Sequence, residues 1–294
     1  MAVGAGMVVR LGSAHPKGAI MGPVEQPPTL LVRGRSARDG EELFYEWFHR
    51  GDGDERPVVV FTHGAGGSHA VWYNQVPALA GAFRVLTWDS RGFGNSTCRS
   101  GRLSAEVAAD DLAALLAAVG VDGPVHLVGQ SMGGWWITAF ALSRPERVRS
   151  LTLSDTPGGL WTPALREHFA AFQKAGGLRF AEVLGRHGAL GETTMRTRPT
   201  LTFLYQELGS FHEPPMAEVG RVVTGTEVAV DAVRALGIPL QVIAGDEDTI
   251  FPAAQLRELA GLLGARYDEL PGAGHSPYFE TPDAYNAALL AFLG

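Results

Sequence analysis

The sequence has few of the features that mark secreted, membrane-spanning or nucleic-acid-binding proteins. Its 294 residues include a single cysteine, Cys98, so the chain cannot form an intramolecular disulfide, and we expect a cytoplasmic protein. Its longest apolar stretch, residues 113–121, is too short to span a membrane and has aspartates on both sides. The net charge is −7 and the 24 lysines and arginines are scattered, so no basic run is present that would bind a nucleic-acid backbone.

Residue spacings typical of metal sites, internal repeats and the lysine-serine ending of a phosphate-binding loop are also missing. We therefore expect neither a metal nor an organic cofactor. The composition is that of a globular protein, 46% hydrophobic, with 38 glycines and 18 prolines that provide many turns. Residues 1–28 are rich in glycine and proline without a steady period, and we expect them to form a flexible N-terminal extension.

Short apolar runs alternate with helix-like stretches along most of the chain. Residues 57–62 (PVVVFT) are β-branched and aromatic, which is typical of a strand buried on both faces of a parallel sheet. The expected strands are residues 30–36, 41–49, 57–62, 83–88, 125–129, 148–154, 240–244 and 266–270, and the expected helices between and after them are residues 104–120, 132–143, 253–263 and 282–292. This order predicts an α/β fold with a mostly parallel, eight-stranded sheet flanked by helices.

The alternation is interrupted after the sixth expected strand. Residues 156–237 contain helical pieces only, expected at residues 163–175, 178–185, 201–208 and 227–236. The core would then comprise residues 29–155 and 238–294. Because the insertion follows the carboxyl end of a strand, where ligands bind in open α/β sheets, we expect residues 156–237 to form a helical lid over a site.

Ser131 lies in a G-x-S-x-G pattern at residues 129–133, between an expected strand and an expected helix. A sharp turn at this place exposes the serine hydroxyl, and the flanking glycines let the strand and the helix approach each other. The N-terminus of the helix favours a developing negative charge. The pattern in this context predicts a nucleophile rather than an ordinary glycine-rich turn.

A serine hydroxyl is a weak nucleophile and needs a base that is itself oriented by a carboxylate. His275 follows the last expected strand and can reach Ser131 from a loop at the carboxyl end of the sheet. The other histidines after Ser131 lie in the insertion and read as ordinary polar positions: His168, His187 and His212. For the acid, we favour Asp248 over Asp246 in the same loop, and Asp155 is a less favoured substitute.

An oxyanion that forms during acyl transfer needs backbone N–H donors. Met132, directly after the nucleophile, is expected to supply one. The second donor is expected from the glycine-rich loop at residues 63–68, where Ala65 is our choice and Gly66 the reserve, with Gly64 beside the substrate. His63 is expected to brace this loop.

The pocket is expected to be apolar and to bind a small apolar molecule. The elbow is followed by Trp135 and Trp136, and the insertion adds Trp161, Phe169, Phe172, Phe180, Phe203, Tyr205 and Phe211. Trp72, Trp136 and Trp161 lie nearest to the motifs, and we expect them to contact substrate, although aromatics at such positions mostly pack elements together.

These motifs together resemble those of the α/β-hydrolase superfamily. HGAGGSHAVW (residues 63–72) is similar to its oxyanion loop, DSRGFGNS (89–96) to a structural turn, and GQSMGG (129–134) to its nucleophile elbow. GDEDTIFP (245–252) is similar to its acid loop, and residues 274–293 to its histidine loop and final helix. The likeness covers about residues 30–294. It implies the α/β-hydrolase fold and a triad of Ser131, His275 and Asp248.

Departures from related groups narrow the expected activity. The serine nucleophile separates the chain from haloalkane dehalogenases and epoxide hydrolases, which use aspartate at this position. Many carbon–carbon bond hydrolases have asparagine before the nucleophile, where this chain has Gln130. What remains is similar to small esterases, enol-lactonases and cofactor-free haloperoxidases.

We therefore expect a serine hydrolase that cleaves a small apolar ester or lactone through an acyl-enzyme. The alternatives on the same site are a carbon–carbon bond hydrolase, a thioesterase, or a lyase or cyclase in a biosynthetic pathway. An acidic substrate would favour these, and the arginines of the insertion that could bind it are Arg166, Arg179, Arg196 and Arg198. A non-enzymatic ligand receptor is the least favoured reading. The sequence leaves room for a homo-oligomer.

Overall fold

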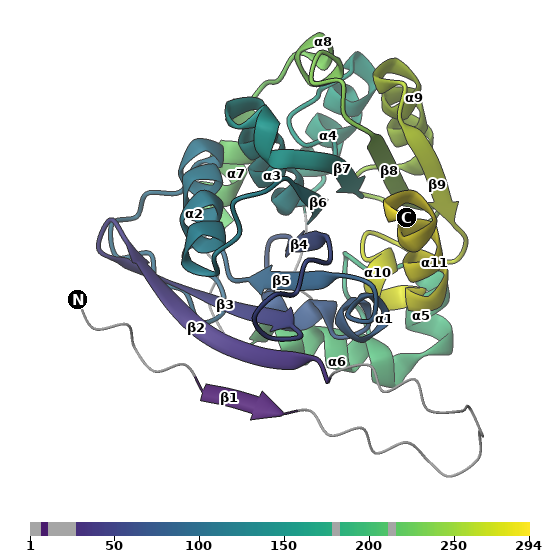
Figure 1. Ribbon diagram of the computed structural model, residues 1–294. Helices are drawn as coiled ribbons and strands as arrows, with labels where there is room; N and C mark the ends of the chain where they lie inside the picture. The colour runs from purple at the N-terminus through teal and green to yellow at the C-terminus, as the bar shows by residue number, and fades with distance from the viewer. Residues whose placement is uncertain (1–6, 11–27, 178–182, 211–215) are drawn as a thin grey trace.

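The computed structural model describes residues 7–10, 28–177, 183–210 and 216–294 as one sheet covered by helices (Figure 1). The strands are β1 (Met7–Arg10), β2 (Leu30–Arg38), β3 (Glu41–His49), β4 (Val58–Thr62), β5 (Arg84–Trp88), β6 (Val125–Gln130), β7 (Val148–Ser154), β8 (Leu240–Gly245) and β9 (Arg266–Leu270). Their order in the sheet is β1-β2-β3-β5-β4-β6-β7-β8-β9.

Strands β2 to β9 form the expected eight-stranded sheet. The neighbouring strands β5-β4-β6-β7-β8-β9 pair in parallel. β2 pairs antiparallel with β3, and β3 pairs antiparallel with β5. β1 adds a ninth strand, antiparallel to β2. We expected residues 1–28 to form a flexible extension; residues 7–10 of that segment are this strand, and residues 1–6 and 11–27 lie outside the described part of the chain.

The sheet is buried on both faces, as the apolar run at β4 predicts. All five residues of β4 are buried. Val60 packs into a core cluster with α2 and α3, whereas Val59 and Phe61 pack into a second cluster with the C-terminal helices. Side chains alternate between the faces of a strand, so the two clusters are the two sides of the sheet. The helices that cover these faces are α1 (Gln75–Leu79), α2 (Ala105–Ala118), α3 (Met132–Ser143), α9 (Ala253–Leu263), α10 (Pro277–Glu280) and α11 (Pro282–Leu293), with short 3₁₀ turns at η1 (His69–Trp72) and η2 (Pro145–Arg147).

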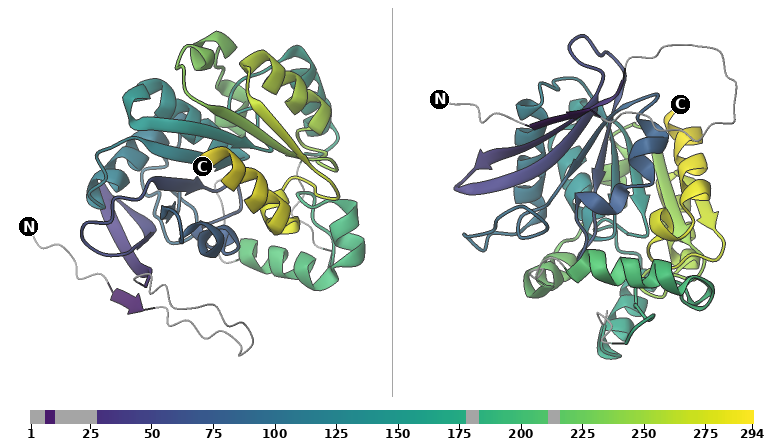
Figure 2. Two further views of the ribbon diagram at one scale, coloured as in Figure 1. Left: turned by 45° about the vertical axis from the view of Figure 1, so that its right-hand side comes forward. Right: turned by 90° about the horizontal axis from the view of Figure 1, so that it is seen from below.

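The described part of the insertion between β7 and β8 consists of helices joined by turns and loops. Its helices are α4 (Pro163–Lys174), α5 (Glu192–Thr197), α6 (Pro199–Ser210), α7 (Met216–Gly225) and α8 (Val230–Arg234). In the right-hand view of Figure 2, α6 and α7 lie beyond one end of the sheet, whereas α8 packs beside α3 and α9. The sequence predicted α4, α6 and α8 but not α5 or α7, which contain threonines, valines or glycine that lower helix propensity. The helix expected at residues 178–185 lies outside the described residues, except for a turn at its end.

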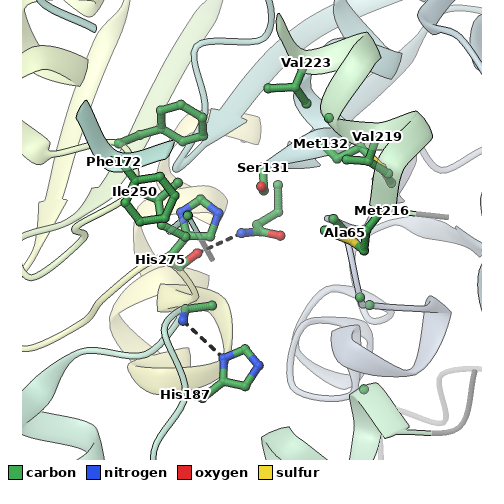
Figure 3. A pocket seen from close by; sticks show the side chains of 18 of the residues that line it. Ala65, Ser131, Met132, Phe172, His187, Met216, Val219, Val223, Ile250 and His275 are labelled. Atoms are coloured by element: carbon green, nitrogen blue, oxygen red, sulfur yellow. Dashed lines mark hydrogen bonds between the residues drawn. The ribbon is translucent and has the colours of Figure 1, made fainter. Parts of the chain in front are cut away.

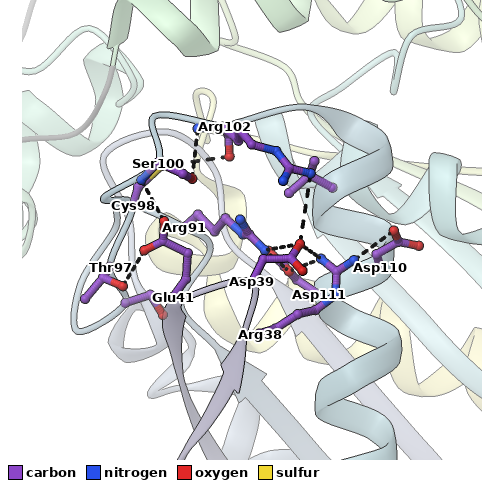
Figure 4. A network of polar contacts seen from close by, with 12 residues as sticks. Arg38, Asp39, Glu41, Arg91, Thr97, Cys98, Ser100, Arg102, Asp110 and Asp111 are labelled. Carbon is purple, nitrogen blue, oxygen red and sulfur yellow. Dashed lines mark hydrogen bonds and ion pairs between the residues drawn. The ribbon is translucent and has the colours of Figure 1, made fainter.

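A buried ion pair holds the turn that follows β5. Figure 4 shows the guanidinium of Arg91 against the carboxylate of Asp111 on α2. The two N–O distances are 2.6 and 2.8 Å, and each side chain is 1% exposed. Arg38 at the end of β2 donates a further hydrogen bond to Asp111. The pair therefore ties the turn, α2 and the edge strands together.

We expect Asp111→Asn to lower the free energy of unfolding by about 3 kcal/mol, because the buried Arg91 would lose its hydrogen-bonded counter-charge and keep only the carboxylate of Asp39, at 3.5 Å. Asp110→Asn on the same helix is the matched control. The Asp110 side chain is 44% exposed and pairs with Arg38 and Arg144 at the surface, so its loss should cost at most about 1 kcal/mol. Urea denaturation measures both variants, and equal losses would contradict the assignment.

Candidate active site

Ser131 occupies the sharp turn between β6 and α3. Its backbone has φ 49° and ψ −122°, a strained conformation for a residue with a side chain. The turn is tight because a Cβ at Gly133 would lie 2.4 Å from the carbonyl oxygen of Thr62. A Cβ at Gly129 would lie 2.6 Å from the carbonyl oxygen of Gly133. Glycine at both positions thus lets α3 begin against the strand ends, as the sequence pattern predicts.

His275 and Asp248 are in contact beside the pocket that Ser131 lines. The Nδ1 atom of His275 lies 2.8 Å from Oδ2 of Asp248, and both side chains are buried. The other carboxylate oxygen, Oδ1, accepts hydrogen bonds from the backbone N–H groups of Ile250 and Phe251 at 2.7 and 3.1 Å. These bonds fix the carboxylate, and the carboxylate in turn fixes the imidazole. Figure 3 shows Ser131 and His275 at the same pocket.

The two alternative acids make other contacts. Asp246 accepts a hydrogen bond from the backbone of Gly272 and is exposed. Asp155 is fully buried, where it accepts hydrogen bonds from the backbone N–H of Gly245 at 2.8 Å and from the Ser154 hydroxyl at 3.0 Å. Burial, followed by the negative charge of Asp248, raises the pKa of Asp155 well above its ordinary value. Of the three carboxylates, Asp248 is the one placed against the imidazole.

The glycine-rich loop after β4 lies beside the elbow. Ala65 and Gly66 both line the pocket together with Met132, and Figure 3 shows Ala65 and Met132 on the same side of Ser131. His63 accepts a hydrogen bond from the backbone N–H of Ser90 at Nε2, so its Nδ1 carries the proton and donates to the carbonyl of Gly64 at 2.8 Å. His63 thus braces the loop, as the sequence suggests.

Gln130, directly before Ser131, links the turn between β6 and α3 to the loop that carries His275. Its amide nitrogen donates a hydrogen bond of 2.8 Å to the backbone carbonyl of His275. Gly64 packs against the same side chain, and a Cβ at Gly64 would lie 2.1 Å from Oε1 of Gln130 and 2.9 Å from Cβ of Ser131. Gly64 therefore allows the close approach of two loops. The sequence assigned it to substrate binding, but it is not among the residues that line the pocket.

The pocket has a volume of about 190 Å³ and is mainly apolar. Its apolar wall comes from the elbow helix, from the insertion and from the acid loop: Trp135, Phe169, Phe172, Leu208, Met216, Val219, Val223, Ile250 and Phe251. Its polar lining comprises Ser131, His275, Gln130, Gln173, His187 and Tyr205. Within the described ranges, no lysine, arginine, aspartate or glutamate lines it. No three metal-ligating side chains cluster anywhere in those ranges.

The tryptophans that we expected to contact substrate lie elsewhere. Trp72 is fully buried between Phe61 and Tyr278, and Trp136 is fully buried in the core on the α2 side of the sheet. Trp161 packs behind the wall, against Trp135, and donates a hydrogen bond to a backbone carbonyl. Trp135 is the tryptophan that lines the pocket. Because it follows Ser131 by four residues, one helical turn, the helix period could have selected it over Trp136.

His187 is a pocket residue that the sequence did not single out. Its Nδ1 accepts a hydrogen bond from the backbone N–H of Ala189 at 3.1 Å, and its ring packs edge-on against Tyr205. Burial, and then the charge of His275, lowers the pKa of His187 to about 4. The imidazole is therefore neutral at physiological pH. Nothing in the local sequence marks His187 as a pocket residue, because its position depends on the path of the whole insertion.

The arginines that could have bound an acidic substrate do not line the pocket. Arg166 pairs with Glu227 at the surface, and Arg198 donates to the backbone carbonyl of Glu280 and to Thr194. Arg196 is exposed, and Arg179 lies outside the described residues. The lining of the described part is thus uncharged when His275 is neutral.

We expect Asp155→Asn to gain stability relative to the wild type as the pH rises. A carboxyl whose pKa is raised by folding contributes stability below its ordinary pKa of 3.8 and loses this contribution as the pH rises toward the raised pKa. The neutral amide has no such dependence. Urea unfolding at acidic and at neutral pH measures the difference, with the exposed Asp122→Asn as the control; a difference that does not change with pH would contradict the raised pKa.

The described residues include no helix of the length and apolarity that a membrane crossing requires. A family model described as alpha/beta hydrolase fold matches residues 57–282. The relative named "Putative non-heme bromoperoxidase BpoC", from Mycobacterium tuberculosis, is 30% identical over 80% of this chain and 92% of its own. An esterase structure from Thermogutta terrifontis superposes with a TM-score of 0.72 at 28% identity, covering 89% of this chain and 97% of its own.

The enol-lactonase of Burkholderia xenovorans LB400 superposes with a TM-score of 0.73 at 26% identity, covering 88% of this chain and 99% of its own. The family match covers well over half of the chain and includes Ser131, the glycine-rich loop after β4, Asp248 and His275. The chain therefore belongs to the alpha/beta hydrolase family of enzymes.

Proposed function

We propose that the protein is a serine hydrolase that cleaves an uncharged ester or lactone with an apolar acyl or alcohol part. One observation carries the proposal: the His275–Asp248 contact lies beside the pocket into which the strained turn at Ser131 presents its hydroxyl. A hydroxyl, an imidazole and a carboxylate in this order along the chain are the components of nucleophilic acyl transfer.

The mechanism follows from the hydrogen bonds of the imidazole. Nδ1 of His275 faces the carboxylate of Asp248, so it carries the proton and leaves Nε2 to accept one. His275 removes the proton of Ser131 as the oxygen attacks the carbonyl carbon, and Asp248 stabilises the imidazolium. The imidazolium then protonates the leaving alcohol oxygen, which gives an acyl-enzyme. Water, deprotonated by His275, attacks this ester and releases the acid and Ser131.

The oxyanion of each tetrahedral intermediate would be held by the backbone N–H groups of Met132 and Ala65. Met132 begins α3, so the partial positive charge of the helix N-terminus adds to its hydrogen bond. Ala65 lines the same pocket as Met132, on the loop that His63 braces. No metal or organic cofactor enters this chemistry.

The lining supports an uncharged substrate. A carboxylate in an apolar pocket needs a counter-charge, and the described lining offers only a neutral His187 and the catalytic His275. This disfavours acidic substrates, which a cationic lid would have indicated for the alternative activities. The names of the esterase and the enol-lactonase are consistent with the proposal. The helices of residues 156–237 form one wall of the pocket, and we infer that they act as its lid.

Ser131→Ala is expected to lower kcat on p-nitrophenyl esters by about 10⁴-fold or more, because the covalent step is lost. It should also abolish labelling by a fluorophosphonate probe. Ser210→Ala, an exposed serine on α6, is the matched control and should leave both unchanged. Labelling of the Ser131 variant, or folded wild-type protein with neither labelling nor turnover, would refute the nucleophile and favour a receptor.

A pair of esters with equal chain length, one ending in a methyl group and one in a carboxylate, tests the substrate class. We expect kcat/KM to favour the methyl-ended ester by about ten-fold or more, since the charged end would be buried without a partner. A higher kcat/KM for the carboxylate-ended ester would contradict the proposed substrate class but not the proposed triad.

A further inference from the structure

Glu280 is a buried carboxylate that the proposed mechanism does not use. It ends α10, five residues after His275, and is fully buried. Burying a carboxylate is unfavourable unless hydrogen-bond donors or a cation compensate. Within the described ranges no lysine or arginine pairs with this carboxylate, because the guanidinium of Arg198 donates to the backbone carbonyl of Glu280 instead. Its hydrogen-bond donors therefore determine what it does.

One oxygen of Glu280 holds the loop that carries the catalytic imidazole. Oε1 accepts hydrogen bonds from the backbone N–H groups of Gly274 at 2.8 Å and of Ser276 at 3.3 Å. These are the two neighbours of His275 in the chain. The carboxylate therefore fixes the backbone on both sides of the imidazole, while Gln130 fixes the carbonyl of His275 itself.

The other side of the carboxylate holds the insertion. Oε2 accepts a hydrogen bond from the backbone N–H of Gly191 at 2.8 Å, and the hydroxyl of Thr194 on α5 donates to the same carboxylate. The backbones of the two segments are in direct contact, since a Cβ at Gly274 would lie 2.3 Å from the nitrogen of Gly191. Glu247, in the acid loop, accepts from the backbone N–H of Thr193 at 2.8 Å. The start of α5 is thus fastened to both catalytic loops.

We infer that Glu280 is a positioning residue: its one carboxylate sets the place of His275 and docks residues 187–194 of the insertion onto the same loop. The inference rests on the proposed function, because it gives His275 the role of base. Residues His187 and Ala189 of this segment line the pocket, so the same carboxylate also fixes part of the substrate wall. Burial raises the pKa of Glu280 above its ordinary value, and the hydrogen bonds from Thr194, Gly191, Gly274 and Ser276 oppose this rise because they stabilise the ionised carboxylate.

Two substitutions separate the two halves of this role. Glu280→Gln keeps the shape but replaces one oxygen by an NH₂ group that cannot accept a hydrogen bond. It also removes the negative charge that strengthens the bonds to the other oxygen, so the contacts on both sides are weakened. Thr194→Val keeps the shape of a fully buried side chain and removes the hydroxyl, which donates to Glu280 and also accepts a hydrogen bond from Arg198, itself in the insertion. Glu258→Gln, an exposed glutamate on α9, is the matched control.

The measurements are the rate of fluorophosphonate labelling of Ser131, KM and kcat on a p-nitrophenyl ester, and amide hydrogen exchange read peptide by peptide. Glu280→Gln should slow labelling and kcat by about ten-fold or more, the equivalent of one hydrogen bond to a charged group. It should speed exchange in peptides covering residues 187–195 and 272–277. Thr194→Val should speed exchange in the first peptide only, raise KM, and leave labelling within about three-fold of wild type.

Labelling and exchange at wild-type values in Glu280→Gln would overturn the inference. Exchange that speeds up evenly over the whole chain in both variants would also overturn it, because Glu280 would then stabilise the fold without positioning the loop. Absence of labelling in the wild type would refute the proposed function instead. In that case, faster hydrogen exchange in Glu280→Gln that is confined to residues 187–195 and 272–277 would still show that Glu280 joins these two segments.

Discussion

The backbone conformation at Ser131 is the constraint on which the rest of the site depends. A positive φ at a residue with a side chain costs about 1–3 kcal/mol and persists only where the surroundings enforce it. Here the surroundings are the ends of β4 and β6, against which α3 begins without room for a Cβ at Gly133. β4 also leads directly into the glycine-rich loop. The turn at Ser131 and the loop with Ala65 are therefore placed by the same packing.

The imidazole and the carboxylate of the site come from loops that lie far from Ser131 in the sequence. His275 and Asp248 lie on loops after β9 and β8, and they meet because parallel strands end at the same edge of the sheet. Gln130 then joins the histidine loop to the elbow across 145 residues of chain. Side chains and backbone groups together hold these residues: the side chain of Gln130 bonds the carbonyl of His275, and backbone N–H groups of its own loop fix Asp248.

The sequence predicted most of what depends on local chemistry. The eight strands, the four long helices on the sheet (α2, α3, α9 and α11) and the contact between His275 and Asp248 follow from apolar periods, glycine-bearing turns and the order of the motifs. The short helices α1 and α10 were not predicted. The insertion was predicted less well. Its short helices α5 and α7 have weak propensity and are stabilised by contacts with the core, which no local pattern records.

The substrate wall was predicted least well, again for a physical reason. Trp72 and Trp136 lie close to the motifs in sequence, but they point into the two core clusters rather than into the pocket. The residues that do line the pocket, such as His187 and Val223, are brought there by the path of the insertion. A pocket wall assembled from separate helices is a tertiary property, so proximity in sequence was a poor guide to it.

The junction at Glu280 has a consequence for how such enzymes can be recombined. The segment after residue 183 contacts the catalytic loops through Gly191, Thr193 and Thr194, and Gly191 and Gly274 approach so closely that neither tolerates a side chain. An insertion transplanted from another family member would need glycine at this crossing and donors at the same spacing. The helices that shape the pocket are therefore not an independent unit, and the dependence extends into α6, because Arg198, just before this helix, and Tyr205 on it also contact the carbonyl of Glu280 and the hydroxyl of Ser276, respectively.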